Sequence, residues 1–318
     1  MYVKEIVLLD PIYGPSQSKL VDRFKVHGAP VQGSDRTEFL RQFAGRVECV
    51  VSHSRFGMSP AEMDALPGLK LIANFGVGLD RLDVDEAARR GITVTHTPDE
   101  LTECVADMAW ALMLGVTRRI LPNDHFVRTG QWLSGPAPLS QKLWGENLGI
   151  VGAGRIGQAI ARRAAGFNME IGYVDPLSKI AGATRFEQVK DLARWARVLV
   201  VACPGTPATR HIIDSEVLVA LGADGYLVNI SRGSNVDEEA LRHAIGAGHI
   251  AGAGLDVFES EPEVPEAFVG DTNVLLQPHV SSGTHQTYAA MGGTVVQNLE
   301  SFYTGQALRN IARPSRAA

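Results

Sequence analysis

Hydrophobic and polar positions along the chain alternate between two periodicities. Short apolar runs, typical of buried parallel strands, fall at residues 3–9, 47–52, 69–73 and 92–95. Between these runs, apolar side chains recur at helical spacing in residues 18–25, 36–42 and 84–90. Strands that alternate with helices in this way predict a parallel sheet with helices on both faces.

The same alternation resumes in the second half of the chain. The apolar runs that predict its strands fall at residues 148–151, 169–174, 198–202, 226–230, 250–257 and 273–276. Residues 102–114 are apolar around much of a helical circumference and predict a long buried helix. Residues 130–138 are rich in turn formers and predict a loop, and residues 284–305 predict a final helix.

A glycine-rich turn opens the second series of strands. The stretch LGIVGAGRIG leads from a buried strand through Gly152, Gly154 and Gly157 into a helix. A dinucleotide site needs glycine for the tight turn, for backbone approach to the pyrophosphate and for helix packing on the strand. Arg155 and Ile156 complete the motif at the helix N-terminus, where N–H groups and the helix dipole attract phosphate.

Asp175 directly follows the next predicted strand, about twenty residues beyond the first glycine. A carboxylate at this position can accept hydrogen bonds from both hydroxyls of the adenosine ribose. An ordinary turn followed by a surface Asp is the weaker alternative in this context. A carboxylate also repels a 2′-phosphate, so the sequence predicts NAD as the preferred cofactor. NADP stays possible because Lys179 lies nearby.

The glycine motif lies in the middle of the chain, with complete βα units on either side. We therefore expect a dinucleotide-binding domain of residues 99–285 inserted into a substrate domain of residues 1–98 and 286–318. The predicted fold class is α/β, with two Rossmann-like, doubly wound parallel sheets. Two chain crossings predict a hinge and a cleft between the domains.

Composition narrows the possible partners and compartment. The 318 residues carry a net charge of −5 and no basic run, so neither nucleic acid nor a membrane surface is an expected partner. Cys49, Cys104 and Cys203 lie far apart, which predicts buried thiols in a reducing compartment and no metal site. The first apolar run is too short for a signal peptide or membrane span, so we expect a cytoplasmic protein.

Polar side chains follow three late strands at what should be one edge of the sheet. Arg232 offers a planar fork that can grip a carboxylate, and His279 can donate and accept a proton near neutral pH. Glu261 or Glu259 could orient that imidazole and stabilise its charged form. Asp256, inside an apolar strand, either caps local backbone or holds the nicotinamide carboxamide. With hydride from a nicotinamide and a proton from the imidazolium, these groups would reduce a ketone to an alcohol, and in reverse they would oxidise a 2-hydroxy acid.

The chain resembles the D-isomer-specific 2-hydroxyacid dehydrogenases over essentially its whole length. The similar motifs are GVGLD at 76–80, TP at 97–98, LT at 101–102, VAD at 105–107, the glycine motif, ACP at 202–204, TP at 206–207, TR at 209–210, NISRG at 229–233, GLDVF at 254–258, EP at 261–262 and PH at 278–279.

This resemblance implies roles for individual residues. The family's catalytic arginine, glutamate and histidine correspond to Arg232, Glu261 and His279, which selects Glu261 over Glu259. Its site for the substrate carboxylate corresponds to the N–H groups of Val77 and Gly78, and Arg232 and His279 also contact substrate and cofactor. The remaining implied cofactor contacts are Thr102, Cys203, Pro204, Thr209, Ile230 and, for the nicotinamide, Asp256. The resemblance also implies a homodimer built on the cofactor domains.

Within the family, the chain is most similar to the glyoxylate, hydroxypyruvate and hydroxyphenylpyruvate reductases. That similarity implies reduction of a small 2-oxo acid. Residues 52–57, with Ser54 and Arg55, are expected in the wall of the substrate pocket, where Arg55 is either a second cation near the carboxylate or a solvated loop charge. Two alternatives remain open. One is a nucleotide-sensing binding protein similar to the corepressors related to this family, and the other is a formate dehydrogenase-like oxidoreductase, against which Glu261 argues because those enzymes pair a glutamine with the histidine.

Overall fold

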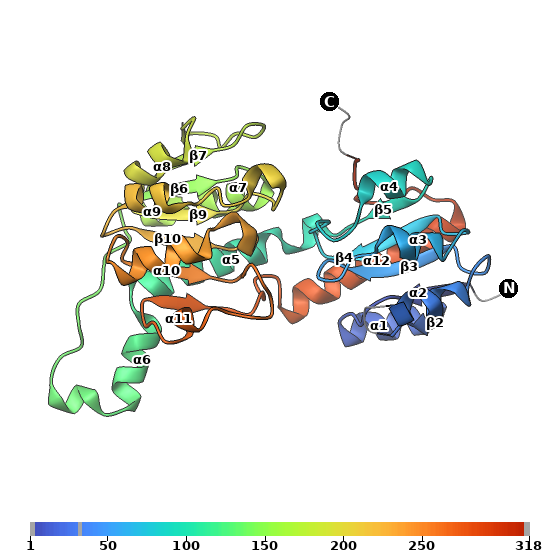
Figure 1. Cartoon of the computed structure of the whole chain (residues 1–318), viewed down its shortest axis with the longest axis horizontal. Coiled ribbons are helices and arrows are strands. Elements are labelled where there is room, and N and C mark those ends of the chain that lie inside the picture. The colour runs from blue at the N-terminus through green and yellow to red at the C-terminus, as the bar shows by residue number, and fades with distance from the viewer. Residues whose placement is uncertain (1–3, 31–33, 315–318) are drawn as a thin grey trace. The chain divides into compact units, whose positions relative to one another are not determined.

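The computed structural model describes residues 4–30 and 34–314 and divides them between two compact units (Figure 1). Unit 1 contains the described residues up to Leu101 and those from Ser282 onward. Unit 2 contains Thr102–Ser281. The chain passes from unit 1 to unit 2 inside helix α5 (Pro98–Thr117).

Unit 1 is built on a parallel sheet whose described strands run in the order β2-β1-β3-β4-β5. Their bounds are β1 (Glu5–Leu8), β2 (Lys25–Gly28), β3 (Cys49–His53), β4 (Leu71–Phe75) and β5 (Thr93–Thr95). The helices of this unit are α1 (Gly14–Val21), α2 (Ser34–Arg41), α3 (Pro60–Asp64), α4 (Val84–Arg89) and α12 (His285–Thr304). Helix α12 packs on β4 and α1, so the C-terminal part of the chain completes the core formed by its first hundred residues.

Unit 2 has a larger parallel sheet, in which the described strands run in the order β12-β11-β10-β9-β6-β7-β8. Their bounds are β6 (Asn147–Val151), β7 (Glu170–Val174), β8 (Thr184–Arg185), β9 (Val198–Val201), β10 (Tyr226–Asn229), β11 (Gly252–Leu255) and β12 (Val274–Leu276). After β6 the chain builds outward on one side through β7, and then returns to the other side with β9. This reversal is the switch point at which open α/β sheets bind ligands, beyond the carboxyl ends of the strands.

Helices and short 3-10 turns connect the strands of unit 2. The helices are α6 (Ile120–Arg128), α7 (Arg155–Ala164), α8 (Val189–Trp195), α9 (Ser215–Leu221), α10 (Glu238–Gly246) and α11 (Glu266–Val269). The 3-10 turns are η1 (Gln131–Ser134), η2 (Ala165–Phe167), η3 (Pro207–Thr209) and η4 (Gly233–Asn235). Within the described ranges, no helix combines the length and the apolar character needed to cross a membrane.

The predicted elements agree with the structure except where local signals were weak. Helix α1 begins at Gly14, four residues before the predicted start, because Pro15 favours a first helical turn. The partly exposed strand β2 was not predicted, since its residues lack an apolar pattern. Turn η1 occupies part of the predicted loop at 130–138. The predicted first strand began at Val3, which lies outside the described residues.

Residues 120–144 form what we call the apolar arm, which extends away from the sheet of unit 2 (Figure 1). Helix α6 buries none of its residues, although its sequence carries several large apolar side chains. The most exposed side chains of the arm are Leu133 and Leu139, at 95% and 97%. Several large apolar side chains exposed on one segment are typical of protein–protein contacts.

Candidate active site

The three motif glycines of unit 2 are required for three different reasons. Gly152 has a φ of 102° and lies so close to the chain at Cys203 that a Cβ would come within 2.6 Å of its backbone nitrogen. At Gly157 a Cβ would lie 2.0 Å from the Gly152 carbonyl oxygen, so this glycine lets α7 pack on the turn. A Cβ at Gly154 would meet no protein atom within 4 Å. Gly154 therefore borders open space at the N-terminus of α7.

The space beside Gly154 fits the pyrophosphate of a dinucleotide. Helix α7 begins at Arg155, directly after this glycine. In the part of the chain that the structure describes, the N–H groups of Ile156 and Gly157 donate to no protein acceptor. Two unpaired donors and the positive end of a ten-residue helix form a binding place for an anion.

Asp175 holds the glycine turn in place. It follows β7, and its Oδ2 accepts a hydrogen bond of 2.7 Å from the N–H of Ala153, the middle residue of the turn. Its Oδ1 accepts from the N–H groups of Leu177 and Ser178, at 2.8 and 2.6 Å. A carboxylate has about four acceptor positions, so three contacts leave room for a ribose hydroxyl. Asp175 is thus a fixed negative charge beside the turn.

Arg232 follows β10, and buried amides support the loop that carries it. The side chain of Asn229 donates to the Arg232 carbonyl oxygen at 2.8 Å and accepts from the N–H of Ser231. The Asn235 amide, fully buried, donates to the carbonyl oxygen of Cys203 at 3.0 Å and so ties this loop to the one after β9. A Cβ at Gly205 would lie 2.7 Å from Arg232 Cγ, so this glycine makes room for the arginine.

His279 and Glu261 form a direct pair at the same edge of the sheet. The Nδ1 of His279 lies 2.7 Å from Oε2 of Glu261, and both side chains are roughly one-third exposed. The other carboxylate oxygen of Glu261 accepts from the N–H of Phe258 at 3.1 Å. Of the two candidate glutamates, Glu259 instead pairs with Arg210, at 2.6 Å. The Glu261 carboxylate thus contacts Nδ1 of the imidazole.

Asp256 fixes the segment that carries the histidine. Its side chain is completely buried, and its carboxylate accepts hydrogen bonds from the N–H groups of Val280 and Ser281, at 2.8 and 2.9 Å, and from the Ser281 hydroxyl. The N–H of His279 also donates to the Asp256 carbonyl oxygen, at 2.7 Å. The structure thus shows the first of the two expected roles, the capping of local backbone. Ser281 was not singled out from the sequence.

A carboxylate lies behind the pair of His279 and Glu261. Burial raises the pKa of Glu238 above its ordinary value, and the negative charges of Glu259 and Glu261 add to this rise. Glu238 also accepts a hydrogen bond of 2.7 Å from the N–H of Glu259. Glu238 of α10 is thus a titratable carboxyl group that is hydrogen-bonded to the loop after β11.

The other residues expected at the cofactor lie around the same edge. Burial raises the pKa of the Cys203 thiol to about 11, so it stays protonated at neutral pH. The Thr209 hydroxyl is used within its own loop, where it donates to the Pro204 carbonyl oxygen at 2.7 Å. Ile230 is buried directly after β10, and Thr102 is buried in α5 at the start of unit 2.

A second glycine turn follows β4 in unit 1. Gly76 has a φ of 128°, and a Cβ there would lie 2.0 Å from the Ser54 hydroxyl oxygen. The N–H of Gly76 donates to the Thr97 hydroxyl at 3.1 Å, and the Thr97 N–H donates back to the Gly76 carbonyl oxygen at 3.0 Å. Val77 and Gly78 continue this turn and are half-buried.

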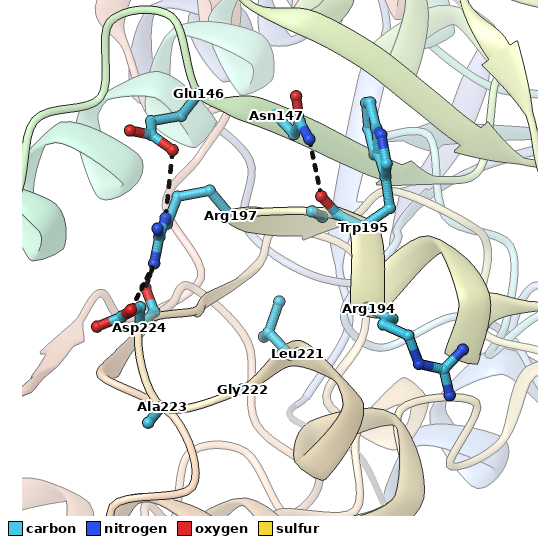
Figure 2. Close-up of a pocket in the computed structure, with 10 residues that line it drawn as sticks. Glu146, Asn147, Arg194, Trp195, Arg197, Leu221, Gly222, Ala223 and Asp224 are labelled. Carbon is cyan, nitrogen blue, oxygen red and sulfur yellow. Dashed lines mark hydrogen bonds and ion pairs between the residues drawn. The ribbon is translucent and has the colours of Figure 1, made fainter.

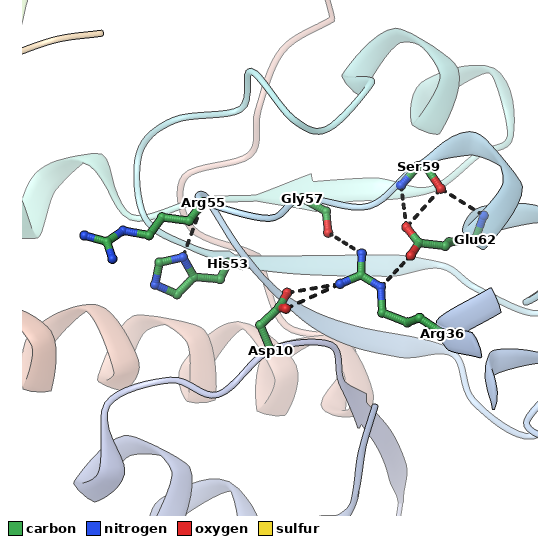
Figure 3. A network of polar contacts seen from close by, with 7 residues as sticks. All are labelled: Asp10, Arg36, His53, Arg55, Gly57, Ser59 and Glu62. Atoms are coloured by element: carbon green, nitrogen blue, oxygen red, sulfur yellow. Dashed lines mark hydrogen bonds and ion pairs between the residues drawn. The ribbon is translucent and has the colours of Figure 1, made fainter. Parts of the chain in front are cut away.

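A buried ionic cluster supports the loop that holds Ser54 and Arg55 (Figure 3). Arg36 of α2 contacts the carboxylates of Asp10 and Glu62, and it donates to the Gly57 carbonyl oxygen at 3.3 Å. Burial raises the pKa of Asp10, and the charge of Arg36 opposes that rise. Breaking such a buried network typically costs about 3–5 kcal/mol, so the end of this loop is firmly held.

A polar hollow of about 290 Å³ lies at the opposite edge of the unit 2 sheet (Figure 2). Asn147 begins β6 and Arg197 directly precedes β9, so the hollow borders the amino ends of the strands. Arg197 is already paired with Glu146 at 3.3 Å and with Asp224 at 3.4 Å. Ligands of open parallel sheets bind at the carboxyl ends, so the hollow is not the candidate site.

The fold and the carboxyl-edge residues of unit 2 together define a dinucleotide-dependent oxidoreductase. The sequence pattern described as "D-isomer specific 2-hydroxyacid dehydrogenase, NAD binding domain" matches residues 110–281. The chain belongs to this family of NAD(P)-dependent dehydrogenases.

Individual relatives support the same assignment over the full length of the chain. Hydroxyphenylpyruvate reductase of Plectranthus scutellarioides is 44% identical over 304 residues, 95% of this chain and 97% of the relative. A solved 2-hydroxyacid dehydrogenase from Ketogulonicigenium vulgare Y25 has a TM-score of 0.92 at 40% identity, with 99% of both chains covered. An NADPH-dependent glyoxylate/hydroxypyruvate reductase from Sinorhizobium meliloti, solved with NADP and malonate, has a TM-score of 0.89 at 38% identity, again with 99% of both chains covered.

Alanine at two of the glycines should separate cofactor binding from folding. Gly154→Ala places a methyl group in the open space beside α7, so we expect an unchanged melting temperature without cofactor and at least tenfold weaker NADH binding. Gly157→Ala drives a methyl group against the Gly152 carbonyl oxygen, so it should lower the melting temperature itself. Thermal unfolding and NADH fluorescence titration measure the two effects. Wild-type NADH affinity in Gly154→Ala would contradict this assignment of the open space.

Proposed function

We propose that the protein reduces a small 2-oxo acid of the glyoxylate or hydroxypyruvate type to the D-2-hydroxy acid. The observation that carries this proposal is the 2.7 Å contact between His279 Nδ1 and Glu261 Oε2, at the edge of the sheet that holds the dinucleotide turn. The reductase relatives support the same substrate class. A bound nicotinamide supplies the hydride.

In this proposal His279 supplies the proton. Because Glu261 accepts from Nδ1, the proton that is transferred sits on Nε2 and passes to the carbonyl oxygen of the substrate as the hydride reaches its carbon. The negative charge of Glu261 stabilises the charged imidazole and holds its orientation. In the direction of oxidation, Nε2 takes the proton from the hydroxyl group.

Arg232 would polarise the 2-oxo acid through its planar fork of N–H donors. The Arg232 Nη1 already donates to the Ser231 carbonyl oxygen at 2.7 Å, which orients the guanidinium. The substrate carboxylate would be bound by the N–H groups of Val77 and Gly78, since adjacent backbone donors in a turn form an anion site. Ser54 and Arg55 would contribute to the wall of the pocket, and Asp256 to the nicotinamide site.

We further propose that NAD is the preferred cofactor. Three backbone N–H groups hold the carboxylate of Asp175 beside the glycine turn, so this side chain cannot easily move away. The negative charge of the carboxylate repels the 2′-phosphate of NADP, and its oxygen atoms can accept a hydrogen bond from a ribose hydroxyl of NAD. This preference differs from that of the Sinorhizobium meliloti relative, which is described as NADPH-dependent.

The apolar arm supports a homodimer built on unit 2. Its exposed large side chains, Leu121, Trp132, Leu133, Leu139 and Trp144, lie on a segment that extends from the unit. Covering such a surface with a second copy of the chain would bury it from water.

Replacing His279 with alanine should lower kcat by about 10²- to 10⁴-fold, the usual contribution of general acid–base catalysis. Steady-state reduction of glyoxylate and hydroxypyruvate with NADH checks this. The control is His243→Ala, because His243 is exposed on α10 and should leave kcat unchanged. An unimpaired kcat in His279→Ala would exclude the role. A wild-type protein that binds NADH and turns over no 2-oxo acid would favour a corepressor-like function.

Cofactor preference should depend on the charge of Asp175. We expect the ratio of kcat/KM with NADH to kcat/KM with NADPH to be above one in the wild type. Asp175→Asn keeps an acceptor oxygen but no charge, so it should reduce this ratio by about tenfold or more, which corresponds to at least about 1.4 kcal/mol. Asp214→Asn removes a charge elsewhere in unit 2, at the N-cap of α9, and should leave the ratio unchanged. A wild-type preference for NADPH would disprove the proposal.

The mass of the chain in solution tests the dimer. Light scattering during gel filtration should give twice the mass of one chain for the wild type. Leu133→Asp combined with Leu139→Asp should give a monomer, because two charges would have to be buried in the contact. Val219→Asp, which alters an exposed side chain of α9, should remain a dimer. A monomeric wild type, or an unaffected double variant, would rule out this interface.

A further inference from the structure

We propose that Asn74 is a positioning residue for the substrate carboxylate. Its buried amide fixes the turn at residues 76–78 so that the N–H groups of Val77 and Gly78 point outward as a pair of donors. The inference rests on the proposed function, because it concerns how the same 2-oxo acid is bound. It assigns a role to a residue that lies behind the site and touches no substrate.

Asn74 is a polar residue inside an apolar strand. It lies in β4, between Ala73 and Phe75, and its side chain is 1% exposed. Burying an amide is costly unless it forms hydrogen bonds. Its Nδ2 lies 2.9 Å from the Ser54 hydroxyl oxygen, 3.2 Å from the Gly78 carbonyl oxygen and 3.3 Å from that of Gly76. One amide group thus joins both ends of the turn to the loop after β3.

The carbonyl groups of residues 76–78 all have hydrogen-bonding partners. Those of Gly76 and Gly78 accept from Asn74, and Gly76 also accepts from the Thr97 N–H at 3.0 Å. The carbonyl oxygen of Val77 lies 3.1 Å from Nδ1 of His96. Each of the three peptide groups is therefore anchored through its oxygen.

Anchoring these oxygens determines where the N–H groups point. In a trans peptide group the C=O of one residue and the N–H of the next point in opposite directions. The carbonyl of Gly76, bound by Asn74, therefore turns the Val77 N–H away from Asn74. The carbonyl of Val77, bound by His96, turns the Gly78 N–H away from His96. Among the residues that the structure describes, neither N–H donates to a protein acceptor. Two adjacent unpaired donors form an anion-binding pair.

The unpaired oxygen of Asn74 supports this interpretation. Its Oδ1 is buried without a hydrogen-bond partner among the described residues. An unpaired buried acceptor destabilises a fold, and a leucine of similar size would avoid it. The donors of Asn74, not its contribution to the core, therefore explain the presence of an amide here.

Two variants of Asn74 test the role in different ways. Asn74→Asp keeps the shape and removes the donors, and Asn74→Leu keeps most of the volume without polar atoms. We expect the KM for glyoxylate or hydroxypyruvate to rise about tenfold to a hundredfold, as for the loss of one or two hydrogen bonds to a charged group. The kcat should change much less. The Kd of NADH, which binds unit 2, should stay at the wild-type value.

A neutral substrate gives a readout that a purely structural role would not change. The wild type should prefer glyoxylate to its methyl ester, because the ester lacks the anionic carboxylate. The ratio of kcat/KM for acid and ester should fall by about tenfold or more in both variants. Equal losses for acid and ester would overturn the inference.

Asn298→Leu is the matched control. Asn298 is also buried in unit 1, at 2% exposure, and its amide holds the backbone of Arg309 through bonds of 3.2 and 2.8 Å. It should lower the melting temperature, because both hydrogen bonds to Arg309 are lost, and leave the acid-to-ester ratio unchanged. A ratio that falls equally in this variant, or that stays unchanged in both Asn74 variants, would disprove the role of Asn74.

Amide hydrogen exchange in the wild type decides the matter if the Asn74 variants do not fold. The Val77 and Gly78 amides should exchange rapidly and become protected when oxamate binds with NADH. The Gly76 amide, which donates to Thr97, should be protected throughout. Protected Val77 and Gly78 amides in the free enzyme would refute the inference. A wild type that reduces no 2-oxo acid would instead disprove the proposed function, before any variant is compared.

Discussion

The opposite directions of C=O and N–H within each peptide group are the constraint on which the ligand-binding turns of this protein depend. The polar backbone groups of a buried turn that point into the protein need hydrogen-bonding partners. If the C=O groups point inward, the N–H groups of the same peptides point outward, and the reverse holds as well. After β4, side chains bind the carbonyl groups at residues 76–78 and leave N–H donors exposed. After β6, Asp175 accepts a hydrogen bond from the Ala153 N–H. The N–H groups that follow Gly154 belong to the first turn of α7.

The chemistry of unit 2 depends on three neighbouring parallel strands that end at one edge. Strands β10, β11 and β12 lead to Arg232, Glu261 and His279, respectively. Buried side chains hold each loop. Asn229 supports the first, and Asp256 at the end of β11 fixes the backbone just beyond His279. The reacting groups are therefore positioned by a polar layer beneath them, as catalysis requires.

The sequence predicts the parts of this molecule whose signals are local. Short apolar runs predict β3, β4, β6, β9 and β10, and the spacing of the glycines predicts the turn before α7. Strand β2, which is partly exposed, and helix α6, which buries none of its residues, are missed because their sequences carry no clear periodicity.

Long-range contacts limit how much of the candidate site can be predicted from the sequence. The backbone-capping role of Asp256 depends on residues 280–281, which are distant in sequence. Asn74 could be suspected only as a polar residue among apolar neighbours, and Arg36 lies in a polar stretch that gives no such signal. Their partners, at Gly57 and at residues 76–78, become visible only when the chain is folded.

Recognition through main-chain groups has a consequence for how such a protein can change over time. A donor that belongs to the backbone is kept through any substitution of the Val77 side chain that preserves the turn. Drift at this position can therefore alter which organic group is accepted at the far end of a ligand, while the requirement for an acid is inherited unchanged. Under the proposed function, new substrates would be explored within the chemical class of carboxylic acids.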